Sequence, residues 1–221
     1  MKTNYWEKLE SDVIYHIYNR AVGKDNLFSD DGNYQFFLKQ WKTYLPYLDV
    51  YVYCLMPNHF HFLAKVKSMT EELKGHLHEQ RTVKSQQFVE GEISYSEYLE
   101  DQFKRFFGSY ALAYNKQQDR HGALFQKRFK RISVLDEYKL HYLVAYIHHN
   151  PLHHRFCTVF ENWKYSSWSA YLHLEQASSL NREEVLSWFD ADLEKARTRF
   201  LKYHEDFRID KKLENETLED D

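Results

Sequence analysis

Cysteine is scarce in this sequence: Cys54 and Cys157 are the only two among 221 residues, and they lie far apart. Such a pair makes neither a disulfide framework nor a metal-ligand motif. The first eight residues lack the apolar core of a signal peptide, and no stretch approaches the roughly 18 apolar residues of a membrane span. We therefore expect a cytoplasmic protein without a membrane segment.

Excess charge of one sign is also missing, because the net charge is only −3. This excludes a uniformly basic nucleic-acid binder, yet the charge is unevenly distributed. Residues 211–221 hold two Lys against five Asp and Glu, whereas residues 103–155 hold ten Lys and Arg against three acids, a local +7. With aromatic residues at 18%, this basic stretch is typical of a surface that contacts phosphates and stacks on bases. A solvated charged face is the alternative. The candidate phosphate contacts are Lys104, Arg105, Lys127, Arg128, Lys130 and Arg131.

The hydrophobic patterning predicts a single domain of mixed secondary structure. We expect strands at residues 15–18, 50–56, 59–66 and 123–134, helices at 31–45, 96–115 and 137–150, and a further helical region at about 183–203. We expect Asp136 to cap the third helix and Pro151 to end it. The polar segment 70–92 is helical at best.

The order of these elements matches a ferredoxin-like split βαβ sandwich, an α+β fold in which an antiparallel sheet carries helices on one face. Residues 172–208 form a C-terminal helical extension to the domain over 1–171. We expect the acidic tail over 209–221 to be disordered.

Two histidines one residue apart, His59 and His61, follow an apolar run that is broken only by Pro57 and Asn58. In an extended strand alternate side chains share a face, so both imidazoles point one way and Phe60 points the other. Two neutral imidazoles in this arrangement can converge on one divalent metal ion that takes further ligands from elsewhere. A paired core or surface histidine is the alternative interpretation.

Tyr146 and Asn150 lie four residues apart and therefore share one face of the predicted helix. The Asn amide oxygen can complete a metal site there while the phenol reaches a substrate beside it. Ionising a phenol of pKa near 10 at pH 7 costs roughly 4 kcal/mol, so a nearby cation or base is required. Tyr142 and Tyr138 fall on the same face and Tyr142 is the rival nucleophile; the Asn-Pro junction favours Tyr146. Histidines 148, 149, 153 and 154 match no four-ligand zinc spacing, and we interpret them as incidental or as phosphate contacts.

Three motifs in this order resemble those of one protein family. They are Tyr15-His16-Ile17-Tyr18-Asn19-Arg20, Leu55-Met56-Pro57-Asn58-His59-Phe60-His61 and Tyr146-Ile147-His148-His149-Asn150-Pro151. Two further stretches agree, residues 122–129 and 163–168. From about Tyr15 to Tyr171 the sequence resembles the single-tyrosine HUH transposases, and within them the REP-associated tyrosine transposases.

The resemblance implies an enzyme that nicks and rejoins single-stranded DNA beside a hairpin. It implies that His59, His61 and Asn150 bind Mg²⁺ or Mn²⁺, and that Tyr146 attacks the scissile phosphate to leave a 5′-phosphotyrosine and a free 3′-hydroxyl. The partner is then hairpin-containing single-stranded DNA, and both a homodimer and a monomer remain open. Two other functions also remain open: a domesticated hairpin-DNA-binding protein without transposition activity, and a metal hydrolase in which Tyr146 only packs.

Overall fold

The computed structural model describes residues 4–80 and 82–208. The strands are β1 (Ile14–Arg20), β2 (Leu48–Met56), β3 (His59–Val66) and β4 (Lys130–Ser133). The helices are α1 (Asp31–Tyr44), α2 (Glu71–Gln80), α3 (Val83–Val89), α4 (Tyr95–Gln117), α5 (Glu137–His153), α6 (Trp168–Leu172), α7 (Arg182–Ser187) and α8 (Leu193–Asp206), with a 3₁₀ turn at Phe160–Asn162. The predicted acidic tail lies outside the described residues.

The four strands form one sheet in the order β2-β3-β1-β4, and every neighbouring pair is antiparallel. Helix α1 connects β1 to β2, a tight turn connects β2 to β3, and α4 lies between β3 and β4. Strands that follow each other across a helix are therefore parallel but separated by a third strand. This is the predicted ferredoxin-like split βαβ arrangement, and the fold-class prediction is confirmed.

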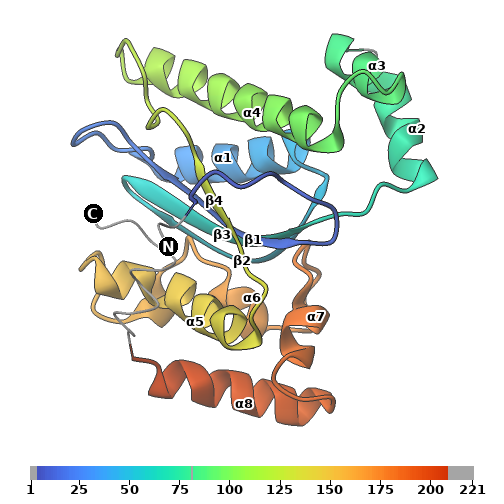
Figure 1. Cartoon of the computed structure of the whole chain (residues 1–221). Helices are drawn as coiled ribbons and strands as arrows, with labels where there is room; N and C mark the ends of the chain where they lie inside the picture. The colour runs from blue at the N-terminus through green and yellow to red at the C-terminus, as the bar shows by residue number, and fades with distance from the viewer. Residues whose placement is uncertain (1–3, 81, 209–221) are drawn as a thin grey trace.

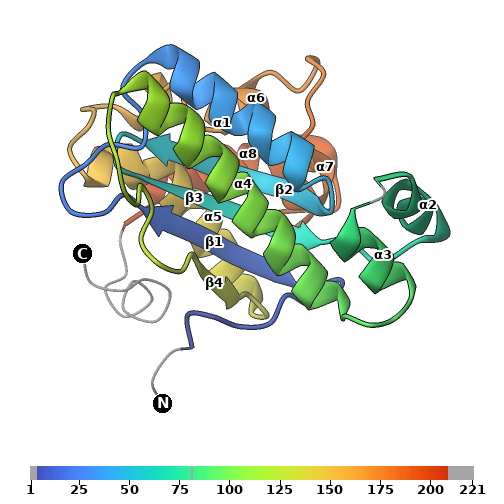
Figure 2. The ribbon, with the colours of Figure 1, turned by 90° about the horizontal axis from the view of Figure 1, so that it is seen from above.

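Helices α1 and α4 cover one face of the sheet, as Figure 1 shows from the side and Figure 2 from above. Their apolar faces pack on aromatic residues of β3: Trp41 stacks on Phe62 with ring centres 3.7 Å apart, and Phe37 lies 5.1 Å from Phe60. Phe106 of α4 contacts Phe37 at 4.9 Å. Burial of this aromatic cluster fixes β3 with its even-numbered side chains toward α1 and α4.

The opposite face of the sheet is covered by the C-terminal helices, with α5 between the sheet and α8 (Figure 1). A helix buried on both sides is apolar around most of its circumference. Residues 142–148 of α5 are accordingly all buried, in a core that also contains Leu63 of β3 and Phe200 of α8. The extension beyond residue 171 is thus packed into the same core as α5.

Both edges of the sheet are covered by other parts of the chain. Along β2, the Leu55 amide donates to the Tyr165 carbonyl and the Ser167 amide donates to the Tyr53 carbonyl, both at 2.9 Å. Along β4, the Arg131 amide donates to the Tyr5 carbonyl at 2.9 Å. These bonds satisfy backbone groups that an open edge strand would leave exposed.

Two predicted boundaries are wrong. In the expected strand over 123–134, the regular ladder with β1 covers only Lys130–Ser133, and Phe125 makes an isolated bridge with Ala21 just beyond β1. Phe125 and Phe129 also pack on Phe107 of α4, at 4.8 and 5.5 Å. Pro151 does not end α5, which continues to His153. A proline removes one amide donor, and the helix still closes with the His154 amide donating to the Asn150 carbonyl at 2.9 Å. The helical region near 183–203 is divided into α7 and α8.

Candidate active site

The turn at Pro57 and Asn58 places His59 as the first residue of β3. His61 pairs with Tyr18 on β1 and with Cys54 on β2, so it lies in the middle of the sheet. Phe60 packs in the core under α1 and α4, whereas His59 and His61 face α5. The two imidazoles therefore share one face of the strand, as the alternation predicts.

Helix α5 brings Tyr146 and Asn150 to these histidines. The Nε2 atom of His59 lies 3.3 Å from Oδ1 of Asn150, and the ring of Tyr146 lies edge-on to His61 with ring centres 6.2 Å apart. All four side chains are buried: Asn150 is 0% exposed, Tyr146 3%, His61 4% and His59 8%. Residues separated by about ninety positions in sequence thus form one cluster, while their chemical roles stay predictions.

The three predicted donors have a geometry that suits a divalent ion. Donor atoms about 2.1 Å from one ion, at right or tetrahedral angles to each other, are about 3.0–3.4 Å apart. The observed separation of 3.3 Å between His59 Nε2 and Asn150 Oδ1 falls in this range. Two imidazoles on one ion have ring centres about 4.5–5.2 Å apart, and those of His59 and His61 lie just beyond that range, at 5.3 Å. The donor set of two imidazoles and one amide therefore fits a divalent ion.

The amide of Asn150 gives a second sign of a ligand. Its Nδ2 atom is buried and has no hydrogen-bond partner within the described part of the chain. Buried amide groups normally have partners, and an exception calls for an explanation such as a bound group. The described residues contain no cluster of three or more His, Cys, Asp and Glu arranged for a metal. Within the described residues the predicted donors are thus two imidazoles and one amide, all of them uncharged.

Each histidine of the pair is oriented by a neighbour on its Nδ1 atom. His59 Nδ1 lies 2.7 Å from Oδ1 of Asn58, and His61 Nδ1 lies 2.9 Å from Nε2 of His16. Asn58 Oδ1 can only accept and lies closer to His59 than Asn150 Oδ1 does, so a neutral His59 with its proton on Nδ1 would turn a bare Nε2 toward Asn150. Burial, with smaller contributions from His16 and His59, holds the pKa of His61 well below its usual range. His61 is neutral at pH 7, the form that a metal ligand requires.

Two further histidines at the site were missed in the sequence. His16 contacts His61 from β1, and the ring of His154 lies 4.6 Å from that of His59. The signal for His154 was available, because it follows Asn150 by one helical turn, at the C-cap of α5. No sequence signal could have placed His16, because its contact depends on the register of β1 against β3.

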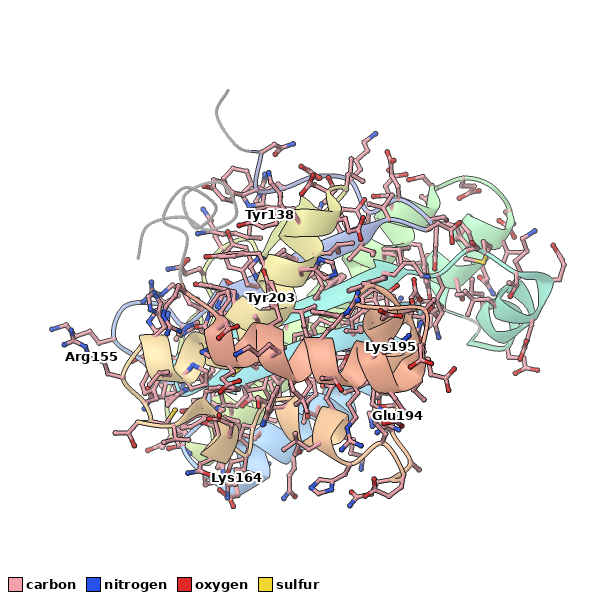
Figure 3. All side chains as sticks on the ribbon, turned by 90° about the horizontal axis from the view of Figure 1, so that it is seen from below. Tyr138, Arg155, Lys164, Glu194, Lys195 and Tyr203 are labelled. Atoms are coloured by element: carbon pink, nitrogen blue, oxygen red, sulfur yellow. The ribbon has the colours of Figure 1, made fainter. Side chains whose placement is uncertain are left out.

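The rival tyrosines lie elsewhere on α5. Tyr142 is one turn further from the histidines, stacked on Tyr146 at 5.7 Å and packed beside Phe207 at 5.4 Å. Tyr138 is 58% exposed at the start of the helix, where Figure 3 labels it. Among the three tyrosines on this face, Tyr146 is thus the one placed against a predicted metal ligand.

A second buried histidine group lies behind the site. His148 Nδ1 is 2.9 Å from Nε2 of His204, and its Nε2 is 2.8 Å from Oγ of Ser167. His204 Nδ1–H donates to the Phe200 carbonyl at 2.8 Å. Both histidines are fully enclosed in the core beneath α8. The pair links α5, α8 and the β2 edge, so the role of His148 within the histidine-rich stretch is structural.

Most of the predicted phosphate contacts gather around one pocket. It has a volume of about 640 Å³ and lies between α4, residues 123–129 and the N-terminal segment. Lys104, Lys127, Arg128 and Arg131 line it together with Phe107, Phe125, Phe129 and Trp6. Asn19 also lines it, while its neighbour Tyr18 stacks on His61 at 5.4 Å. The pocket is therefore on the α4 face of the sheet, across β1 from the histidine cluster.

The six predicted phosphate contacts differ in their surroundings. Arg131 is 7% exposed; its guanidinium is paired with Glu100 and donates to the Glu7 carbonyl. Arg105 lies over the ring of Tyr44, at 5.6 Å, away from the pocket. Lys130 lies over the rings of Tyr18 and Tyr5, at 5.5 and 5.6 Å, on the face that carries the histidines. Arg131 thus has a structural ion pair, whereas Lys130 is next to the candidate active site.

Comparisons with known proteins show the fold alone. No family model and no curated protein sequence matches the chain. None of the described helices is long and apolar enough to cross a membrane. A solved structure of a REP-associated tyrosine transposase bound to a REP hairpin superposes with a TM-score of 0.55 at 11% identity, covering 86% of this chain and 93% of that one. The chain therefore has the fold of this hairpin-bound transposase along most of its length.

Proposed function

We propose that this protein nicks and rejoins single-stranded DNA beside a hairpin, through a 5′-phosphotyrosine on Tyr146. The observation that carries this proposal is the convergence of Tyr146 with His59, His61 and Asn150, two imidazoles and an amide spaced for one divalent ion. A tyrosine that only packs in the core would not require metal-binding side chains beside its ring. The fold shared with a transposase bound to a REP hairpin supports the same reaction class and the same kind of DNA.

The chemistry needs only the phenol and the phosphodiester. The Tyr146 oxygen forms a bond to phosphorus, the bond from phosphorus to the 3′ oxygen breaks, and that oxygen takes up a proton to become a 3′-hydroxyl. Rejoining reverses these events, so the phosphotyrosine conserves the phosphodiester and no high-energy cofactor is consumed. His59, His61 and Asn150 would hold Mg²⁺ or Mn²⁺, which supplies positive charge to the non-bridging phosphate oxygens.

A candidate acceptor for the phenol proton lies on the same helix. The ring of His153 lies 6.3 Å from that of Tyr146, seven residues further along α5. Tyr146 is 3% exposed, so its proton has few routes to bulk water. We assign His153 the role of general base in cleavage, a role that the sequence did not suggest.

The DNA is proposed to contact both faces near β4. Lys130 lies on the active-site face, where its ammonium group would bind the backbone close to the scissile phosphate. On the other face, the aromatic pocket with Lys104, Lys127 and Arg128 has the chemistry to hold an unpaired base and its phosphates. Selectivity would then come from the shape of the hairpin and from a few unpaired bases beside it. Work on cellular DNA is consistent with the expected cytoplasmic location.

The decisive experiment is covalent capture. Labelled single-stranded hairpins from the flanks of the protein's own gene are incubated with Mn²⁺ or with a chelator, and the products are separated on a denaturing gel. We expect a metal-dependent protein–DNA adduct that is lost in Tyr146→Phe and kept in Tyr142→Phe. Hairpin binding without an adduct in any condition would instead support the domesticated DNA-binding protein. Metal-dependent hydrolysis without an adduct would support the hydrolase.

A further inference from the structure

The contact between His16 and His61 has no part in the function proposed so far. His16 is 0% exposed on β1, and its Nε2 atom lies 2.9 Å from Nδ1 of His61. The two rings are nearly parallel, 16° apart, and the ring of Tyr18 stacks on both, at 4.7 and 5.4 Å. Strand register fixes these positions, because His16 pairs with Leu63 and Tyr18 with His61.

We propose that His16 is a positioning residue, which accepts the Nδ1 proton of His61 and thereby leaves His61 Nε2 bare for a divalent ion. The inference rests on the proposed metal site and deepens it. A neutral imidazole carries one proton, so which nitrogen is free for a metal depends on the bond that the other nitrogen makes. Metal-binding histidines almost always donate their second nitrogen to such an outer partner, and loss of that partner lowers metal affinity 10–100-fold.

The same arrangement is present on the other histidine, which supports a common purpose. Asn58 accepts from Nδ1 of His59 at 2.7 Å, as His16 is proposed to do for His61 at 2.9 Å. Asn58 precedes β3 and His16 belongs to β1. Two separate elements therefore place an acceptor at the Nδ1 atom of each histidine. Both acceptors are uncharged, and neither would neutralise the ion.

The chain supplies a matched control for burial. His148 and His204 form a second enclosed pair with the same Nδ1 to Nε2 separation of 2.9 Å, beneath α8 and away from the metal donors on β3. Replacing His204 removes the partner of a buried imidazole, as replacing His16 does. Only His16 touches a predicted metal ligand. A difference between the two variants therefore separates positioning from general core packing.

The experiment measures tautomer and metal affinity in the full chain. Imidazole ¹⁵N shifts, recorded without metal and with Mg²⁺, report which nitrogen of His61 carries the proton. Titration calorimetry with Mn²⁺ reports affinity for wild type, His16→Leu, His16→Gln and His204→Leu, and urea unfolding verifies that each variant is folded. Gln at position 16 keeps an acceptor near the place of the lost Nε2 atom, whereas Leu keeps volume alone.

We expect the proton of wild-type His61 on Nδ1, and a 10–100-fold loss of Mn²⁺ affinity in His16→Leu. His16→Gln should recover most of that loss, and His204→Leu should bind Mn²⁺ as wild type does. A proton on Nε2 of His61 in the presence of Mg²⁺, or wild-type affinity in His16→Leu, would overturn the proposal. If the wild type binds no Mn²⁺, the tautomer still decides the role of His16 while the metal-dependent function fails. If the tautomer and the Mn²⁺ affinities are as expected but no covalent adduct forms on Tyr146, the proposed nicking function is wrong and the role of His16 stands.

Discussion

Acid should weaken this fold through His204, well before any carboxylate is protonated. The side chain is 1% exposed, and both nitrogens are engaged: Nδ1–H donates to the Phe200 carbonyl at 2.8 Å, and Nε2 accepts from His148 at 2.9 Å. Burial lowers the pKa of His204 from 6.5 to about 3. A second proton would place two N–H groups face to face between the two imidazoles. The folded state therefore holds His204 neutral where the unfolded chain protonates it.

The sign and size of the effect follow from linkage. Wherever the unfolded state binds more protons than the folded state, the free energy of unfolding decreases as the pH is lowered. For His204 this range extends from pH 6.5 down to about 3. At pH 5 the unfolded chain is almost fully protonated at this residue and the folded chain is not. The free energy of unfolding is then about 2 kcal/mol lower than at pH 7, from His204 alone. By pH 3 the loss from this residue reaches about 4 kcal/mol.

Urea unfolding at pH 7 and pH 5 tests this value. His204→Phe removes the titrating group at the cost of about 1–3 kcal/mol for the lost hydrogen bonds at pH 7. We expect the variant to lose about 2 kcal/mol less than wild type between the two pH values. The exposed His121, changed to Gln, serves as the control and should track wild type. An equal loss in wild type and His204→Phe would refute the assignment of a depressed pKa to this buried pair.

Three further predictions concern the candidate site. Tyr146→Phe should unfold within about 1.5 kcal/mol of wild type while losing all covalent DNA capture, because only a hydroxyl is removed; capture that persisted in this variant would transfer the role to Tyr142. Asn150→Asp should bind Mn²⁺ more tightly by calorimetry yet cleave more slowly, because an added carboxylate attracts the ion and repels phosphate; weaker Mn²⁺ binding would argue against Asn150 as a ligand. Four side chains are proposed to contact DNA phosphates: Lys104, Lys127, Arg128 and Lys130. Changing all four to Gln should reduce the slope of log binding constant against log salt concentration by about 3, as measured by fluorescence anisotropy with the hairpin. An unchanged slope would place the DNA elsewhere.

Local patterning was sufficient for much of the fold. Alternation placed His59 and His61 on one face of β3, with Phe60 on the other, because a strand buried on both sides still has a period of two. Four-residue spacing placed Tyr146 and Asn150 together on α5 for the equivalent reason in a helix. Both inferences concern residues close in sequence, where backbone geometry alone sets the distances.

Contacts between distant segments were beyond such patterning. The alternation of Phe125 and Phe129 resembled a long strand, but both rings pack on Phe107 of α4, and Phe125 makes only an isolated bridge with Ala21. Arg131 was grouped with the surface cations, although Glu100 and the Glu7 carbonyl bind it inside the fold. In each case the partner lies many residues away, and the sequence has no periodic signal for it. For that reason Arg131 is absent from the cation set chosen for the binding experiment.

The charge of the donor set has a direct consequence for the proposed chemistry. Two imidazoles and one amide carry no charge, so a divalent ion bound by them would keep its full +2 to act on a phosphodiester. A site built from carboxylates binds Mg²⁺ or Mn²⁺ more tightly but neutralises much of the charge that the reaction uses. The neutral orienting groups, Asn58 and His16, preserve this charge in turn. We therefore expect weak affinity for the free ion together with strong polarisation of the bound phosphate. The DNA itself would supply the negative ligands that the protein lacks.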